Sequence, residues 1–287
     1  MAFKFVNPGY PALFDTMDSG SLIGGVNSTY NPENGVYIDI CSDSGYVTIP
    51  NLDHIYISFG LFGLDMSHTK EFFNLYAGNT RIAKIQFFGS GHGIDLFGNS
   101  SSALNYVVLN NNNYYKCLFD VELTGSKCNI ALFIDGTKKA SGTYDCSETA
   151  ITEVKICNSN GNSGYGMISN IIIADVDCSN ERIAICDLTT NNDVINVDAD
   201  ALAAKMAEYV DNAAITSLQV GASNIDVASS NITSIKETLN STDIETKSIS
   251  AKKGVIFNNM AANPLTGSNW TVQTLKDVRF KLTGVKA

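Results

Sequence analysis

The chain has 287 residues, of which 44% are hydrophobic and 17% are charged, and its formal net charge is −10. This length suffices for one large β domain with appendages or for two domains. The acidic balance, with no basic run longer than a lysine pair, argues against a nucleic-acid partner, because phosphate binding needs clustered Lys and Arg.

The first 30 residues are irregular, with Pro8, Pro11 and a Gly/Ser-rich stretch at 19–25. We interpret them as an N-terminal arm that leads into the first strand. They show no charged leader followed by an apolar core, so no signal peptide is expected. No apolar run in the sequence is long enough to predict a membrane span.

Short strands are predicted from Val36 to Cys178, because apolar and polar residues alternate there between turns rich in Gly, Asn and Pro. Pro50 is expected to end the second strand. No part of this region has sustained helical periodicity. The pattern predicts an all-β double sheet of about a dozen strands. Outside the central hairpin, strands are expected at 36–40, 46–49, 55–62, 72–76, 81–88, 93–97, 106–109, 151–157 and 166–176.

The clearest pattern is a hairpin from Tyr115 to Lys138. Residues 124–127 are small or polar and can close a tight turn between two strands. The second strand is expected to end at Asp135-Gly136, another turn signal, before the chain returns to solvent. The residues expected on the core face are Phe119, Val121, Leu123, Ile130, Leu132 and Ile134.

After Cys178 the pattern changes, and Asp198 to Val210 is predicted as a helix with Asp198 as its N-cap. Beyond it, apolar residues recur at intervals of seven. This repeat predicts a coiled-coil stem, whereas the many Ser, Thr and Asn residues leave a fibrous β segment as the alternative. Either stem is too thin to be stable alone, so a homo-oligomer is expected, with a trimer preferred. The oligomerisation residues would be Leu218, Ile225, Ile232 and Leu239.

The C-terminal tail is expected to contain strands at 255–257 and 277–285, with a turn at Asn263-Pro264. Residues 271–275 fit either one helical turn or a strand. The predicted organisation is therefore a β-sandwich at 1–178, a linker, helix and stem at 179–250, and a small β-containing segment at 251–287.

The seven cysteines are an odd number without CxxC spacing. Several lie in predicted strands, so we expect reduced, buried thiols. The three histidines, His54, His68 and His92, form no HxxxH pattern. No metal site or other cofactor is therefore predicted, and no feature indicates a structural Ca²⁺. The cysteines are Cys41, Cys117, Cys128, Cys146, Cys157, Cys178 and Cys186.

The stretch from Phe72 to Asp175 resembles the concanavalin A-like (laminin-G-like) jelly roll. A strand ends in a hydrophobic-x-Asp-Gly motif at 131–136, and a strand at 152–156 and a Gly-rich turn at 161–166 follow. The closing strand reads Ile168-Ser169-Asn170-Ile171-Ile172-Ile173. The resemblance covers roughly residues 20 to 178 and implies a lectin-like sandwich.

The C-terminal third resembles bacteriophage tail or virion-fibre proteins. A low-charge repeat precedes the segment Asn263 to Thr271, which reads NPLTGSNWT. This resemblance implies a virion protein that assembles with other virion proteins in the host cytoplasm and is extracellular after lysis.

Glycan recognition would use aromatic faces and amide or carboxylate groups on loops. Each aromatic candidate also fits ordinary packing in a sheet. Asp135-Gly136, which would lie near a cation- or sugar-binding rim in some relatives, is interpreted as a hairpin turn. The candidate ligand-binding residues are Asn111, Asn112, Asn113, Tyr114, Tyr144 and Tyr165.

A glycan-cleaving enzyme of this fold would need paired carboxylates. Asp120 and Glu122 share a strand face, but the third acid of the Glu-x-Asp-x-Glu pattern of relatives is missing, and a solvated face explains them. Asp175 and Asp177 are interpreted as turn residues, and His92 lies beside no nucleophile signature. We therefore expect no catalytic residues and no enzyme.

These features predict a structural or adhesive component of a phage or phage-like particle, whose lectin-like domains bind a glycan or receptor through avidity. One alternative is an architectural virion protein that binds only other subunits. The second alternative is a jelly-roll enzyme that cleaves a polysaccharide.

Overall fold

The structure is a computed structural model, and it divides into two compact units, Met1–Glu181 and Arg182–Ala287. The described parts of both units consist mostly of antiparallel strands, which confirms the expected mainly-β fold. Each unit is treated by itself below. The described residues are 4–7, 16–17, 38–39, 45–65, 71–87, 93–156, 165–180, 188–191, 194–197, 204, 215, 218–226, 232–248, 253–260 and 262–286.

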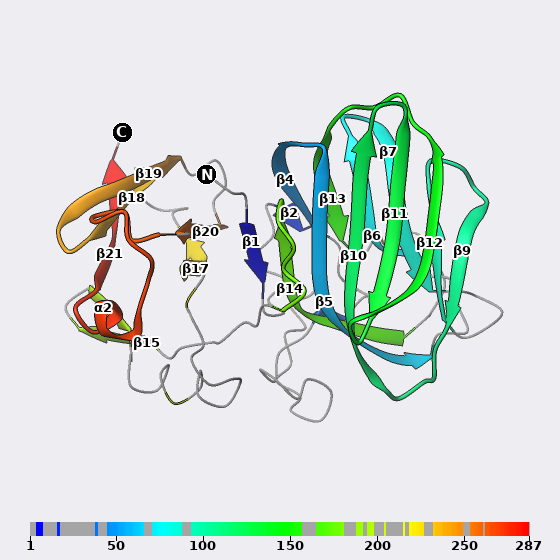
Figure 1. Ribbon diagram of the computed structural model, residues 1–287. Helices are drawn as coiled ribbons and strands as arrows, with labels where there is room; N and C mark the ends of the chain where they lie inside the picture. The colour runs from blue at the N-terminus through cyan, green and yellow to red at the C-terminus, as the bar shows by residue number, and fades with distance from the viewer. Residues whose placement is uncertain are drawn as a thin grey trace. The chain divides into compact units, whose positions relative to one another are not determined.

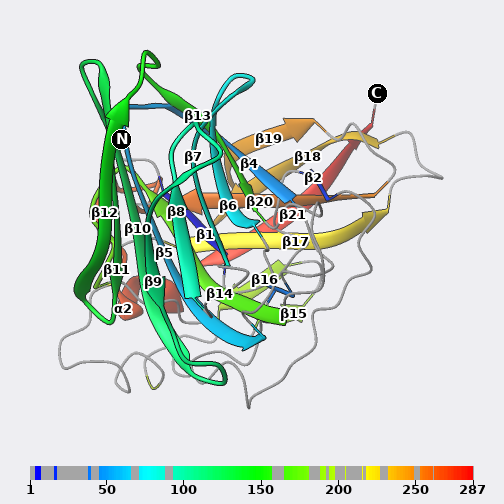
Figure 2. The same ribbon diagram turned by 90° about the vertical axis from the view of Figure 1, so that its right-hand side faces the viewer.

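The first unit is a sandwich of two seven-stranded sheets that lie face to face (Figures 1 and 2). Sheet A runs in the order β1 (Lys4–Asn7), β14 (Tyr165–Ala174), β5 (His54–Asp65), β10 (Tyr114–Thr124), β11 (Lys127–Ile134) and β12 (Thr137–Asp145), and β3 (Ile38–Asp39) also pairs with β14. Sheet B runs in the order β2 (Thr16–Met17), β4 (Gly45–Leu52), β13 (Ile151–Ile156), β6 (Glu71–Ala77), β7 (Thr80–Phe87), β8 (Gly93–Phe97) and β9 (Ala103–Val108).

The core of the sandwich lies between the two sheets and follows from the alternation of apolar residues along the strands. Phe59 of sheet A packs edge-on against Phe73 of sheet B, with ring centroids 4.9 Å apart. Burial of such a ring contributes roughly 1.5–3 kcal/mol, so contacts of this kind hold the sheets together. Other fully buried residues are Ile55, Ile57, Leu61, Leu75, Ile85, Leu96, Phe119, Val121, Leu132 and Ile173.

The predicted central hairpin is confirmed as β10 and β11. Phe119 lies opposite Leu132, and Val121 lies opposite Ile130. These four side chains are buried on the core face. In the turn Gly125 has a φ of +62°, a conformation that glycine adopts without steric cost.

The sequence prediction misses β12. Asp135 and Gly136 have φ values of +49° and +74°, and they form a tight turn that leads into a further strand of the sheet instead of out to solvent. β12 is the edge strand of sheet A, and only Ala140 within it is buried. An edge strand whose two faces are mostly exposed to solvent shows little alternation of apolar and polar residues, so its sequence does not indicate a strand.

The expectation that a strand ends at Pro50 is wrong, because β4 continues to Leu52. The register of β4 against β13 shifts at this point, between the pair Thr48–Glu153 and the pair Leu52–Ile151. Such a bulge lets the strand continue although proline has no N–H to give to the ladder.

The N-terminal arm, expected to be irregular, contributes two short edge strands to the sandwich. β1 pairs with β14 in sheet A, and β2 pairs with β4 in sheet B. The predicted helix at 198–210 lies outside the described residues except for Ala204, which is helical. Within the described part of the chain, no helix has the length and apolar character needed to cross a membrane.

The second unit holds a five-stranded and a two-stranded sheet. The larger sheet runs in the order β15 (Leu188–Asn191), β16 (Val194–Val197), β21 (Arg279–Lys286), β18 (Ile232–Leu239) and β19 (Thr242–Ser248). The smaller one pairs β17 (Leu218–Asp226) with β20 (Lys253–Met260).

A coiled coil is wrong for the residues of the seven-residue repeat, because they lie in strands. Leu218 and Ile225 belong to β17, and Ile232 and Leu239 are the first and last residues of β18. The β-branched and Thr residues of these segments favour strands over helices. Their backbone partners are β19, β20 and β21 of the same chain. A role of the four residues in oligomerisation stays a prediction.

The core of the second unit is built around Trp270, the single tryptophan of the chain. Trp270 is 2% exposed, and its Nε1–H donates to the carbonyl oxygen of Met260 at 2.9 Å. Thr271 caps the short helix α2 (Val272–Lys276) by accepting from the backbone N–H of Thr274, so a helical turn is the correct alternative here. The other buried members of this core are Leu239, Met260, Leu275, Val278 and Phe280.

Candidate functional site

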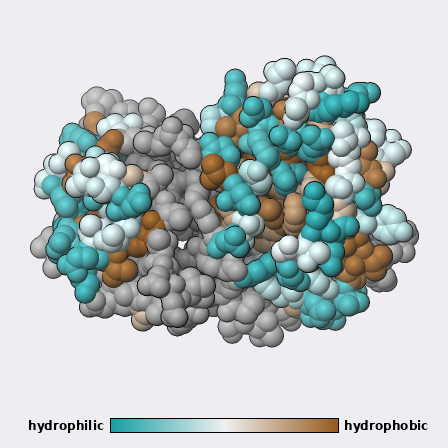
Figure 3. Space-filling model, viewed as in Figure 1, coloured by the Kyte–Doolittle hydropathy of each residue, from teal (hydrophilic) through white to brown (hydrophobic). Residues whose placement is uncertain are grey.

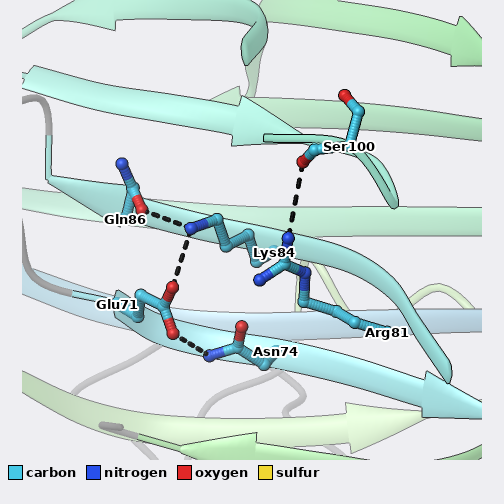
Figure 4. A network of polar contacts seen from close by, with 6 residues as sticks. All are labelled: Glu71, Asn74, Arg81, Lys84, Gln86 and Ser100. Atoms are coloured by element: carbon cyan, nitrogen blue, oxygen red, sulfur yellow. Dashed lines mark hydrogen bonds and ion pairs between the residues drawn. The ribbon is translucent and has the colours of Figure 1, made fainter. Parts of the chain in front are cut away.

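The outer face of sheet B, which points away from the core, carries polar side chains on three neighbouring strands. Alternation along β7 turns Lys84 and Gln86 outward, because the apolar residues between and beside them belong to the core. Register places Asn74 of β6 opposite Lys84. Glu71 of β6 and Asp95 of β8 lie on either side of Gln86. We call these five residues the sheet B cluster; Figure 4 shows four of them from close by.

A bulge in β6 brings two of these residues onto the same face. The register against β7 shifts between Glu71 and Phe73, so that Phe72 and Phe73 are both fully buried. Two successive side chains on the core side allow Glu71 and Asn74 to share the outer face. Asn74 Nδ2 donates to Glu71 Oε2 at 3.2 Å.

Lys84 holds the sheet B cluster together. Its Nζ donates to Glu71 Oε1 and to Gln86 Oε1, at 2.7 Å in both cases, and lies 4.5 Å from the centre of the Phe97 ring. The side chains of Lys84 and Glu71 are 11% and 16% exposed. In so little solvent the ammonium group and the carboxylate stabilise each other's charge more than an exposed pair would.

Among the described residues, two oxygens of the sheet B cluster have no hydrogen-bond partner, namely Asn74 Oδ1 and Asp95 Oδ1. Asn74 is 1% exposed and Asp95 is 6% exposed. Burial raises the pKa of the Asp95 carboxyl above its ordinary value of 3.8, opposed by a hydrogen bond with Gln86 and by the charge of Lys84. An unmatched buried acceptor costs about 1–3 kcal/mol, so both oxygens are positioned to accept from water or a ligand.

Arg81, near the start of β7, adds a hydrogen-bond donor that has no acceptor among the described residues. Its guanidinium donates to the carbonyl oxygen of Ser100 through Nη2 at 3.4 Å (Figure 4), whereas its buried Nε has no partner in the part of the chain that the structure describes. The outer face of sheet B therefore offers acceptors at the sheet B cluster and a donor at Arg81.

The outer face of sheet A carries polar residues that satisfy one another. His54 Nε2 lies 2.8 Å from Asp120 Oδ1, and both side chains are partly exposed, at 30% and 26%. Glu122 Oε2 accepts from Asn129 Nδ2 at 3.3 Å, and Asn129 Oδ1 accepts from Thr143 at 3.0 Å. In Figure 3, which shows this side of the sandwich, hydrophilic and hydrophobic residues are interspersed. These contacts are typical of a solvated sheet face with cross-strand pairs.

Most of the predicted ligand-binding residues lie at one end of sheet A. Asn111 to Asn113 precede Tyr114 at the start of β10. The Tyr114 ring lies over Gly60, where a Cβ would come within 2.8 Å of its carbon atoms, so a larger residue there would force the Tyr114 ring to shift. Tyr165 begins β14 opposite Asp65, at the same end of the sheet. A ligand-binding role for this group stays a prediction.

Tyr144 does not join that group. It lies opposite Cys128, about 30 Å along the hairpin from Tyr114 at 3.3 Å per residue. Its hydroxyl donates to the carbonyl oxygen of Ile82, its ring lies against Gly98, and burial raises its pKa. Tyr144 therefore packs β12 of sheet A against strands of sheet B.

The expectation of reduced, buried thiols is confirmed for the described cysteines, Cys117, Cys128, Cys146 and Cys178. The remaining cysteines, together with His68 and His92, lie outside the described residues. Within the part of the chain that the structure describes, no group of three or more His, Cys, Asp or Glu side chains is placed to hold a metal ion.

No residue of the sheet B cluster is among the site residues predicted from the sequence. Lys84 and Gln86 alternate with apolar residues, which is also the pattern of a strand with one solvated face. The doublet Phe72-Phe73 breaks the alternation and is the signal that could have indicated the bulge. Burial of the outer face and the unmatched oxygens follow only from the tertiary structure.

No protein-family model matches the chain, and no curated protein matches it either. Among solved structures, the basic winged bean lectin with Tn-antigen is similar at a TM-score of 0.40 and 8% identity, over 61% of this chain and 98% of the lectin. The CBM2 module of the evolved Dit of Lactobacillus casei BL23 phage J-1 is similar at 0.36 and 15%, over 56% of this chain and 90% of the module.

Enzymes are also among the similar structures. A prokaryotic beta-1,3-1,4-glucanase (lichenase) from a mouse hindgut metagenome is similar at a TM-score of 0.40 and 11% identity, over 61% of this chain and 99% of the lichenase. A sialidase is similar at 0.37 and 10%, over 50% of this chain, which spans 16% of the sialidase. The expectation that the chain is not an enzyme is therefore corrected, because a sialidase, a glycosidic hydrolase and a lichenase are among the solved structures to which the chain is similar.

Proposed function

We propose that the first unit is a carbohydrate-binding domain whose ligand contacts the sheet B cluster. The observation that carries this proposal is the pair of buried, unmatched acceptors, Asn74 Oδ1 and Asp95 Oδ1. A hydroxyl group both donates and accepts hydrogen bonds, so a polyhydroxylated ligand can satisfy these oxygens and also the Nε–H of Arg81. A metal cation fits less well, because the ammonium group of Lys84 occupies the centre of the cluster.

The sheet B cluster reaches solvent at its rim. Glu71 and Lys84 retain some exposed side-chain surface, and Tyr106, which lies opposite Asp95 on β9, is 57% exposed. An exposed aromatic ring beside polar groups suits the apolar face of a sugar ring. A ligand therefore meets Glu71, Lys84 and Tyr106 first, because these side chains keep exposed surface at the rim of the cluster.

We further place this domain in a phage or phage-like particle, as a virion or tail-fibre component for host attachment. The support is the resemblance of the segment from Asn263 to Thr271 and of the low-charge repeat before it. Weak binding at one site becomes effective when a homo-oligomer, with a trimer preferred, presents several copies. Other virion proteins are the remaining partners, and the protein is extracellular once the virion is released.

Binding is tested with the full chain on a glycan array, followed by calorimetric titration of the glycans that bind. Asn74→Ala removes one of the two acceptors, and we expect at least about 10-fold weaker binding, equivalent to about 1.4 kcal/mol. Asn129→Ala removes the same group from sheet A and should leave the affinity unchanged. Silence on the array contradicts the proposal and favours an architectural role. Equal loss in both variants contradicts the assignment to the sheet B cluster, because the loss would then not depend on the acceptor of Asn74.

A further inference from the structure

We propose that Lys84 and Asn74 become joined by an amide bond between their side chains, which the folded chain forms by itself with Glu71 as the carrier of protons. The bond links β6 and β7 covalently in the middle of sheet B. Carbohydrate binding does not require it, so this inference goes beyond the proposed function and is tested separately. It needs no cleft, because both reacting groups belong to the chain.

The register of β6 and β7 and the carboxyl group of Glu71 hold the two reacting groups together. Asn74 and Lys84 are directly opposite each other, which places their Cβ atoms about 4.5–5.5 Å apart. Figure 4 shows the Glu71 carboxyl between them: Oε1 accepts from Lys84 Nζ at 2.7 Å, and Oε2 accepts from Asn74 Nδ2 at 3.2 Å. The flexible four-carbon stem of Lys84 lets Nζ turn from Glu71 to Cγ of Asn74 by rotation about its own bonds.

The surroundings of these groups suit a reaction between an amine and an amide. Lys84 is 9% exposed and Asn74 is 1% exposed, and the Phe97 ring lies 4.5 Å from Nζ. So little solvent keeps water from competing with the amine for the amide carbon. The hydrogen bond from Nζ to Glu71 lies within the distance at which a general base takes a proton directly.

Gln86 offers a competing amide, since Lys84 Nζ also donates to Gln86 Oε1 at 2.7 Å. Asn74 is the better partner, because its nitrogen is the group that must leave and that nitrogen already contacts Glu71. Gln86 instead forms a hydrogen bond with Asp95. The contacts therefore place the proton carrier at both nitrogens of the Lys84–Asn74 pair.

The step balances without an oxidant or any other co-reactant. Glu71 takes a proton from the ammonium group of Lys84, and the free amine forms a bond to Cγ of Asn74. The bond between Cγ and Nδ2 breaks as Glu71 gives its proton to Nδ2, and Glu71 then takes a second proton from the attacking nitrogen. The products are the new amide, ammonia and a protonated Glu71 carboxyl. Oδ1 of Asn74 remains as the carbonyl oxygen of the new amide, so the acceptor used in the carbohydrate proposal is kept.

Mass spectrometry of the intact full chain tests the bond. We expect a mass about 17 Da below that calculated from the sequence, which is the loss of one ammonia molecule. The loss should be absent from Lys84→Arg, Asn74→Ala and Glu71→Gln. Asn129→Ala is the matched control, because Asn129 contacts Glu122 on sheet A in the way that Asn74 contacts Glu71, and it should keep the loss.

Tryptic digestion locates the bond. Arg81, Lys84 and Lys116 are successive cleavage sites, and Asn74 lies in the peptide 71–81. Trypsin does not cleave after a lysine whose amine is part of an amide, so we expect the peptide 71–81 to be joined to the peptide 82–116. This measurement uses the unaltered chain and does not depend on whether a variant folds.

The unaltered chain at its full calculated mass overturns the proposal. A loss of ammonia without joined peptides also overturns it, because the change then lies within one peptide, at Asn74 alone or between Lys84 and Gln86. A Glu71→Gln variant that has the fold of the parent by circular dichroism and still loses ammonia rules out Glu71 as the proton carrier. None of these results bears on glycan binding, so the two proposals fail separately.

Discussion

Asp95 links single-residue chemistry to the pH dependence of stability. Its carboxyl is 6% exposed, one of its oxygens is unmatched, and burial raises its pKa above 3.8. The folded chain therefore holds this proton more tightly than the unfolded chain does. By linkage, the free energy of unfolding falls as the pH rises from about 3.8 through the folded pKa, and it is level above that.

Asp95→Asn removes this titration and keeps the shape of the side chain. We expect the variant to be about 1 kcal/mol more stable than the parent at pH 7, because no buried charge forms, and to equal it at pH 3. Urea unfolding at pH 3, 5 and 7 measures the difference. Asp145→Asn is the control, since that side chain is 85% exposed. A gain of equal size at pH 3 and pH 7 would show that charge burial is not the cause.

At the scale of elements, the turn between β11 and β12 decides whether the edge strand of sheet A forms. Asp135 and Gly136 both have positive φ values, and the Asp135 side chain accepts from the backbone N–H of Lys116 at 3.1 Å. No neighbouring atom lies within 4 Å of a Cβ added at Gly136. A substitution there is therefore opposed by backbone conformation and not by crowding.

Gly136→Ala should lower the free energy of unfolding by about 1–2 kcal/mol, the cost of the left-handed conformation for a residue with a Cβ. Asp135→Asn should change it by less than about 0.5 kcal/mol, because Asn tolerates this conformation and keeps the accepting oxygen. Urea unfolding followed by circular dichroism measures both. Equal stability of Gly136→Ala and the parent would mean that the turn relaxes without strain.

The sequence predicts correctly those strands whose core-facing side chains are apolar and pack against other apolar side chains. The central hairpin is found because Phe119 and Leu132 alternate with polar residues in both strands. β12 is missed because an edge strand needs no such alternation. β17 and β18 are mistaken for a stem because each has two apolar residues seven positions apart, and Ile225 of β17 and Ile232 of β18 have the same spacing.

At the scale of the whole molecule, the sequence predicts the fold class but not the sheet B cluster. A two-layer β-sandwich follows from strand patterning, since each sheet must bury one apolar face. The sheet B cluster depends on the bulge at Phe72, for which the Phe72-Phe73 doublet is the only local signal. It also depends on two facts that no local pattern contains: the line of Glu71, Gln86 and Asp95 across strands, and the burial of an outward face. The aromatic ligand-binding candidates are instead predicted on the basis that loops often carry function.

The two units have separate cores, so the role of Leu239, one of the predicted oligomerisation residues, can be tested within the second unit. Leu239 is fully buried in the core that contains Trp270, and Trp270 is the single tryptophan of the chain, so its fluorescence reports the second unit. Leu239→Ala should destabilise the fluorescence-detected transition by about 2–5 kcal/mol, the usual result of a cavity in a core. The matched change Ile57→Ala lies in the sandwich core. It should instead destabilise the transition that circular dichroism detects and tryptophan fluorescence does not.

Light scattering on Leu239→Ala distinguishes a core residue from a contact between chains. If Leu239 supports only its own unit, the molar mass below the unfolding transition equals that of the parent while the fluorescence transition moves. If Leu239 instead joins partner chains, the mass falls at protein concentrations where the parent stays assembled, because an oligomer that loses interface area dissociates by mass action. We expect the first outcome, since Leu239 is fully buried in a core cluster that also contains Met260, Leu275 and Phe280.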